Sequence, residues 1–200
     1  MLVLHPQFVA VMFEGLVELA ERGLSGEEVD ARSFRAKLLG LIYEDLLEVW
    51  FKEVMRCDHV EKDVRRGKYG DKRVAVDFIL EKARRLYVVE AKCWPAYHEG
   101  RLKKLTFNRI ERVKREFRKF GTPFLEDDFV EKYRFEGKSV DGKILVWWDV
   151  EESEAERIKG ELKLAELISL KRILSELRGK ADNIVGKYRE WVDQLFAALL

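Results

Sequence analysis

The chain has 200 residues with a net charge of +1; 38% of them are charged and 47% hydrophobic. This length and hydrophobic content suit one domain, 1–200, with a substantial core. A net charge this close to zero excludes bulk attraction to nucleic acid, so any such binding has to come from local basic patches.

The rare residue types narrow the class of protein further. Cys57 and Cys93 form no CxxC motif, and His5, His59 and His98 lack the spacing of zinc ligands. We therefore expect a reduced, cytoplasmic protein. Few amides beside many Lys, Glu and Arg residues favour a thermophilic source. The chain has neither a signal-peptide pattern nor an apolar stretch of about 18 residues, so no membrane contact is predicted.

The first quarter of the chain is predicted to be helical. Residues 6–22 carry a wide apolar stripe at helical spacing, and residues 27–55 predict a longer helix that is apolar on most sides. Such a helix is expected to be central to the core. Glu44 stands inside it, with Gly40 one turn earlier. This carboxylate either serves a functional site or pairs with a nearby basic side chain.

The middle of the chain predicts an antiparallel meander of three strands. Residues 57–66 predict a strand near an edge of a sheet, and residues 67–71 predict a turn. Residues 73–80 and 86–93 predict the next two strands, because Val, Ile, Phe and Tyr dominate both segments.

The last two predicted strands place two carboxylates opposite each other. If their turn centres between Ala83 and Arg84, residues whose numbers sum to 167 face each other, and Asp77 lies opposite Glu90. Alternation along the strand puts Lys92 on the face of Glu90. Like charges directly opposite destabilise a sheet unless a cation or a proton resolves the conflict. The arrangement predicts a divalent-metal site or, alternatively, a structural ion-pair cluster.

The remaining elements surround this hairpin. Residues 99–120 predict a helix in which nine basic residues outnumber three acidic ones, and residues 122–142 are acidic and irregular. Residues 143–150 predict a buried strand, and residues 151–177 and 182–200 predict two helices. The last helix is expected either to close the core or to form a dimer contact.

The order of these residues resembles the PD-(D/E)xK nuclease superfamily. The matching residues are Glu44 in a helix, Asp77 in a strand and Glu90-Ala91-Lys92 in the next strand, followed by the basic helix. The element order predicted for residues 27–150 is similar to the core of that family. The spacing from Asp77 to Glu90 is similar to that of archaeal Holliday-junction resolvases.

Some features depart from the family pattern. Val76 stands where the motif has proline, although that position is loose in the family. The helix after E-x-K lacks the Q-x-x-x-Y motif, and the cysteines that hold an iron–sulfur cluster are absent, which argues against RecB-like and Cas4-like branches. The resemblance implies an α/β fold with a restriction-endonuclease-like core. That core would be a mixed sheet of 4–5 strands flanked by helices at about 27–150, with an N-terminal helix and a C-terminal helical extension at about 151–200.

The resemblance also implies a function, which is metal-dependent DNA endonuclease activity of the kind used in repair or recombination. Asp77, Glu90 and the Ala91 carbonyl would bind Mg²⁺ or Mn²⁺, the hard cations that oxygen ligands hold. Lys92 would orient the attacking water or stabilise developing charge on the phosphate. Glu44 would hold a second metal or a water bound to the metal.

DNA is the expected partner of this site. Arg101, Lys104, Arg112 and Arg115 of the basic helix are the expected phosphate contacts, unless that helix face is merely solvated. A homodimer through the C-terminal helices is also expected. Two alternatives are a non-catalytic nucleic-acid-binding or assembly protein that retains the nuclease fold, and a purely structural helical protein with an incidental hairpin.

Overall fold

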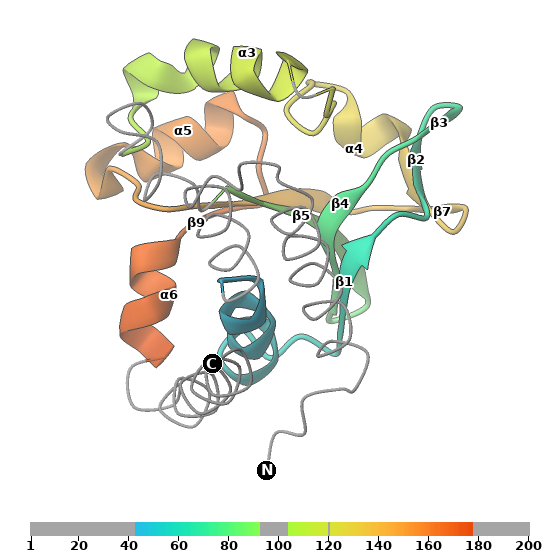
Figure 1. The fold of residues 1–200 in the computed structure, drawn as a ribbon, viewed down its shortest axis with the longest axis horizontal. Helices are drawn as coiled ribbons and strands as arrows, with labels where there is room; N and C mark the ends of the chain where they lie inside the picture. The colour runs from blue at the N-terminus through green and yellow to red at the C-terminus, as the bar shows by residue number, and fades with distance from the viewer. Residues whose placement is uncertain (1–42, 93–103, 120, 178–200) are drawn as a thin grey trace, which may run out of the picture.

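A computed structural model of the chain describes residues 43–92, 104–119 and 121–177. Its centre is a mixed sheet of five strands in the order β1-β4-β5-β8-β9 (Figure 1). The strands are β1 (His59–Val64), β4 (Val76–Lys82), β5 (Arg85–Lys92), β8 (Gly142–Trp147) and β9 (Glu166–Ser169). β1, β4 and β5 pair antiparallel, whereas β5, β8 and β9 pair parallel. The predicted α/β class with a mixed sheet is confirmed.

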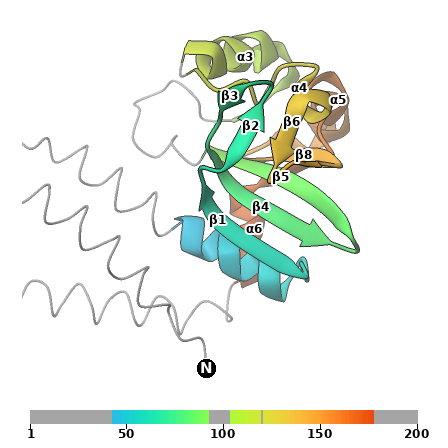
Figure 2. The ribbon, with the colours of Figure 1, turned by 90° about the vertical axis from the view of Figure 1, so that its right-hand side faces the viewer.

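A second, smaller sheet lies beside the first. It contains β2 (Gly67–Tyr69), β3 (Lys72–Arg73), β6 (Tyr133–Phe135) and β7 (Lys138–Ser139), in the order β3-β2-β6-β7. Figure 2 shows β2 and β3 continuing from one end of β1 and β4. The turn predicted over 67–71 is confined to residues 70 and 71, and residues 67–69 form β2 instead. Strands of two or three residues are too short to produce a recognisable alternation.

Helices cover both faces of the five-stranded sheet. They are residues 43–53, η2 (Phe107–Arg109), α3 (Ile110–Lys119), α4 (Phe129–Lys132), η3 (Glu152–Glu154), α5 (Ala155–Glu161) and α6 (Leu170–Leu177). In Figure 1, α3, α4 and α5 lie above the sheet, and residues 43–53 and α6 lie below it. No helix in the described ranges has the length and apolar character needed to cross a membrane.

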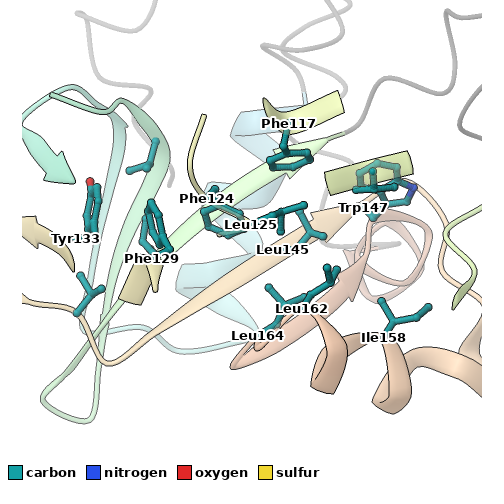
Figure 3. Packing of buried hydrophobic residues seen from close by; sticks show 14 of the residues in the cluster. Phe117, Phe124, Leu125, Phe129, Tyr133, Leu145, Trp147, Ile158, Leu162 and Leu164 are labelled. Atoms are coloured by element: carbon teal, nitrogen blue, oxygen red, sulfur yellow. The ribbon is translucent and has the colours of Figure 1, made fainter. Parts of the chain in front are cut away.

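Each face of the sheet contributes to a separate hydrophobic cluster. Ile79 and Val88 point toward α3, α4 and α5, into the cluster around Phe117 that Figure 3 shows. Their neighbours Phe78 and Val89 point to the other side, where residues 43–53 and α6 lie. The alternation of side chains along a strand thus separates the two clusters.

The hairpin of β4 and β5 has the predicted register. Phe78 pairs with Val89, so opposed residue numbers sum to 167. Ala83 and Arg84 have φ angles of 51° and 64°. Two successive positive φ angles are typical of the two-residue turn whose twist matches that of the flanking strands. The turn is therefore centred where the sequence predicted it.

Two predicted helices differ from the structure. Leu105 bridges to Val150, and α3 starts only at Ile110, so the helix predicted from residue 99 is wrong over 104–106. The helix predicted over 151–177 is interrupted by β9, which pairs with β8 and brings the five-stranded sheet into the predicted C-terminal helical extension. The predicted helices at 6–22 and 182–200, and most of the one at 27–55, lie outside the described residues.

Candidate functional site

Asp77 and Glu90 lie where β4 and β5 begin to separate. The last pair of their ladder is Phe78 with Val89, one step before the two carboxylates. Beyond it, the Ala91 amide donates a hydrogen bond of 2.6 Å to Asp77 Oδ2. The Asp77 side chain therefore replaces a backbone carbonyl as the acceptor, and this bond holds its carboxylate against β5.

Lys92 is held between Glu90 and α3. Its Nζ lies 2.5 Å from Glu90 Oε1 and 5.5 Å from the centre of the Phe117 ring. Glu90 is buried, with 5% of its surface exposed. Charge-assisted hydrogen bonds of this length are among the stronger polar contacts in proteins. The E-x-K motif thus presents a buried carboxylate and its ammonium partner on the α3 side of the sheet.

Burial and mutual repulsion disfavour ionisation of the two carboxylates. Burial raises the pKa of Glu90 to about 7, with the charge of Asp77 acting in the same direction and Lys92 opposing it. Burial also raises the pKa of Asp77, while Lys92 and the Ala91 amide lower it. Two such groups side by side favour a bound cation or a proton between them.

Glu44 approaches Asp77 from the other side of the sheet. Its Oε2 lies 3.8 Å from Lys62 Nζ in β1, and the adjacent Asp45 Oδ1 lies 2.7 Å from the same nitrogen. Burial raises the pKa of Glu44 to about 7; Lys62 lowers it, and the charges of Asp77 and Asp63 raise it. The charge of Asp77 therefore affects the pKa of Glu44, whereas the ion pair that Glu44 forms is with Lys62 in β1.

Three charged residues near the site were not predicted from the sequence. Asp45 is buried and shares Lys62 with Glu44. Asp63 has a φ of 53°, and the β1–β4 register passes from Lys62–Phe78 to Val64–Val76, which leaves Asp63 opposite Asp77. One signal was readable: Lys62 lies two residues from both Val60 and Val64, a spacing that puts all three on the same face of a regular strand.

The donor set fits a hard divalent cation with few protein ligands. Asp77 Oδ1 and Glu90 Oε2 accept no hydrogen bond from the described residues. Over the same residues, no three His, Cys, Asp or Glu side chains lie close enough together to hold a metal ion. Mg²⁺ usually keeps several waters and uses only one or two carboxylates. Asp77 and Glu90, with the Ala91 carbonyl as the expected third ligand, meet that requirement.

The predicted DNA contacts on the basic helix have different environments. Arg112 and Arg115 are exposed on α3 and make no ion pair with any residue that the structure describes. Lys104 precedes α3, and its Nζ lies 2.7 Å from Glu151 Oε2. Arg101 lies outside the described residues. Only Arg112 and Arg115 therefore present a charge that is not already partnered within the described chain.

Comparisons with known proteins leave the family open. No protein-family model and no curated protein matches the chain. One solved structure that is similar is protein VC1899 from Vibrio cholerae, with 14% sequence identity and a TM-score of 0.33. The match covers 68% of this chain and 31% of that chain. At this level of similarity, neither the fold nor the activity of one protein follows from the other.

Proposed function

We propose that the protein is a metal-dependent DNA endonuclease that hydrolyses phosphodiester bonds with a PD-(D/E)xK-type site. The observation that carries the proposal is the register of the β4–β5 hairpin. It sets Asp77 across from Glu90 at the end of the ladder, with Lys92 two residues further along β5. An aspartate, a glutamate and a lysine in this relation are the combination that the superfamily motif describes.

The order of the elements gives further support. Helical residues 43–53 are followed by the antiparallel strands β1, β4 and β5, then by α3 and the parallel strand β8. This is the sequence of elements expected for a restriction-endonuclease-like core, with β2 and β3 as an insertion between β1 and β4. Glu44 lies on the first helix of this order, as the resemblance requires.

Each residue of the site would have a separate role in phosphodiester hydrolysis. Asp77 and Glu90 would hold Mg²⁺ or Mn²⁺, with the Ala91 carbonyl beside them. When bound, the cation would supply Lewis-acid stabilisation of the phosphate and acidify the attacking water. Lys92, held by Glu90 at 2.5 Å, would place its ammonium where negative charge develops on the phosphate. Glu44 would accept a hydrogen bond from a water on the side of Asp77.

Cleavage assays test the proposal directly. With Mn²⁺, the full chain should cut at least one of four DNA substrates: duplex, single strand, flap or four-way junction. Glu90→Gln keeps the shape of the side chain but removes its charge, and Lys92→Met removes the ammonium. Each should lower the cleavage rate by at least about a hundredfold, the scale seen when one transition-state contact is lost.

Glu81→Gln provides a matched control for these variants. Glu81 is an exposed carboxylate on β4 of the same hairpin, remote from the Asp77 end, so its loss should leave the rate unchanged. Full activity in Glu90→Gln, or no cleavage of any of the four substrates by the wild type, would contradict the proposal. A non-catalytic nucleic-acid-binding protein of this fold would bind the same DNA without cutting it.

A further inference from the structure

A row of positive charges crosses the four-stranded sheet. Arg73 pairs with Lys68, Lys68 with Arg134, and Arg134 with Ser139, so one row runs through β3, β2, β6 and β7. Residues directly opposite in a sheet share a face. With neighbouring strands about 4.8 Å apart, the three cations span about 10 Å. We call Arg73, Lys68, Arg134 and Ser139 the basic row.

The basic row faces outward from the molecule. The alternate residues Tyr133 and Phe135 are buried in the cluster on the α3 side of the main sheet, and Tyr69 packs against it. Because side chains alternate along a strand, the basic row points away from that cluster. Lys68, Arg73 and Ser139 are exposed, and Arg134 is half-buried. The row is therefore available to a partner.

Two cations of the basic row differ from nearby basic residues in their ion pairs. Arg66 lies 2.5 Å from both Glu61 and Glu136, and Lys132 lies 2.5 Å from Asp128. Lys68 and Arg73, by contrast, make no ion pair with any residue in the described part of the chain.

Arg134 is fixed in place, since its Nη1 donates to the carbonyls of Glu131 and Tyr133 at 2.6 and 2.8 Å. Like charges directly opposite in a sheet are destabilising. A bound anion would offset that repulsion.

The basic row is connected directly to the candidate site. β2 and β3 are inserted between Val64 and Val76, the last pair of the β1–β4 ladder, and Asp77 follows at once. Arg73 precedes Asp77 by four residues, so their Cα atoms lie within about 14 Å of each other. The Arg73 end of the row therefore lies close to the end of the sheet that carries Asp77 and Glu90.

We propose that the basic row binds the phosphate backbone of DNA and holds it against the candidate site. The inference rests on the proposed function for its choice of polymer. A span of about 10 Å corresponds to about three phosphates of one strand, at 3.4 Å of helix axis per phosphate. Arg73, Lys68 and Arg134 supply the charges, and the Ser139 hydroxyl supplies a further donor at the end of the row.

The test measures DNA binding by the full chain with EDTA present, so that cutting does not interfere. Fluorescence anisotropy with a labelled duplex gives the affinity at several salt concentrations. Lys68→Ala/Arg73→Ala should weaken binding at least about tenfold. The slope of log K against log salt should fall by about 0.9 for each phosphate contact removed. Lys68→Gln/Arg73→Gln, which retains more of each side chain, should show the same loss.

Lys82→Ala/Arg85→Ala is the matched control. These residues form an equivalent Lys–Arg pair directly opposed in the β4–β5 ladder, at the end remote from Asp77. Their loss should leave the affinity and the salt slope unchanged.

An unchanged slope in both basic-row variants overturns the inference even if the wild type cuts DNA, and so does a wild type that binds no DNA. Binding that depends on the row in a protein that never cuts supports the inference while contradicting the proposed nuclease.

Discussion

At the scale of single residues, Gly67 shows how closely the backbone of β2 lies against the Tyr133 side chain of the neighbouring strand β6. A Cβ atom at this position would lie 1.8 Å from the Tyr133 hydroxyl oxygen. Gly67→Ala should therefore lower the free energy of unfolding by about 2 kcal/mol, in the range of other overpacking substitutions. Gly160→Ala is the contrasting change, because nothing lies within 4 Å of its added methyl group.

Gly160 lies within α5, where alanine is favoured over glycine by up to about 1 kcal/mol. Urea unfolding of the two variants should give shifts of opposite sign. If Gly67→Ala were as stable as the wild type, β2 could not approach Tyr133 as closely as described.

Lys143 is expected to make the stability of the protein depend on pH. Its side chain is buried, and Nζ donates to the carbonyls of Phe124 and Glu126 at 3.0 and 3.1 Å. Burial lowers the pKa of Lys143 from 10.5 to about 8. Between these two values the unfolded chain binds more protons than the folded one, so this group makes the free energy of unfolding rise with pH.

The measurement is the difference in unfolding free energy between the wild type and Lys143→Met at a series of pH values. Below about pH 8 the wild type carries the full cost of the buried charge. Between about pH 8 and about pH 10.5, the free energy of unfolding of the wild type should rise by about 3 kcal/mol relative to that of the variant, at 1.36 kcal/mol per pKa unit. A difference that does not change over this interval would contradict the lowered pKa.

At the scale of elements, Lys62 connects β1 to helical residues 43–53. Its ion pair with Asp45 is 2.7 Å long, with side-chain exposures of 17% and 6%. Removing one partner of a buried pair leaves the other charge poorly compensated. Lys62→Met should therefore lower the free energy of unfolding by about 3 kcal/mol.

Lys52→Met is the comparison on the same helix. Lys52 pairs with Glu48 at 2.5 Å, but its side chain is 46% exposed. Exposed pairs one helical turn apart contribute only about 0.3–0.5 kcal/mol. Chemical denaturation should give a much larger loss of unfolding free energy for Lys62→Met than for Lys52→Met. Equal losses would show that burial does not distinguish the two ion pairs.

At the scale of the whole molecule, a bound cation should stabilise the fold. Binding to the folded state alone raises the free energy of unfolding by about 2.7 kcal/mol at a concentration of 100 Kd. Saturating Mn²⁺ should raise the midpoint of thermal unfolding of the wild type, and Asp77→Asn should abolish the shift.

Asp63→Asn offers a control for general charge effects. Asp63 lies opposite Asp77 in the β1–β4 register but is exposed. That variant should retain most of the shift. An equal shift in the wild type and Asp77→Asn would place the cation away from the candidate site.

The β4–β5 hairpin could be predicted from the sequence because everything that determines it is local. Two apolar segments flank a two-residue turn at Ala83 and Arg84, and the turn sets the register. Once the register is known, the positions of Asp77 and Glu90 follow from the alternation of the strands. Strand β8 was predictable from its own apolar residues, whereas the mixed arrangement of the sheet was expected only from the resemblance to a nuclease family.

Long-range pairing decided the rest. β9 lies in a segment with helical spacing, yet it forms a strand because β8 offers a free edge to pair with. β2 finds its partner β6 much later in the chain, so no local pattern could indicate the second sheet or the basic row. The approach of Lys62 to Asp45 and Glu44 likewise depends on how a helix packs on a sheet. The sequence by itself determined the hairpin and its opposed carboxylates, and only the tertiary structure decided which charges surround them.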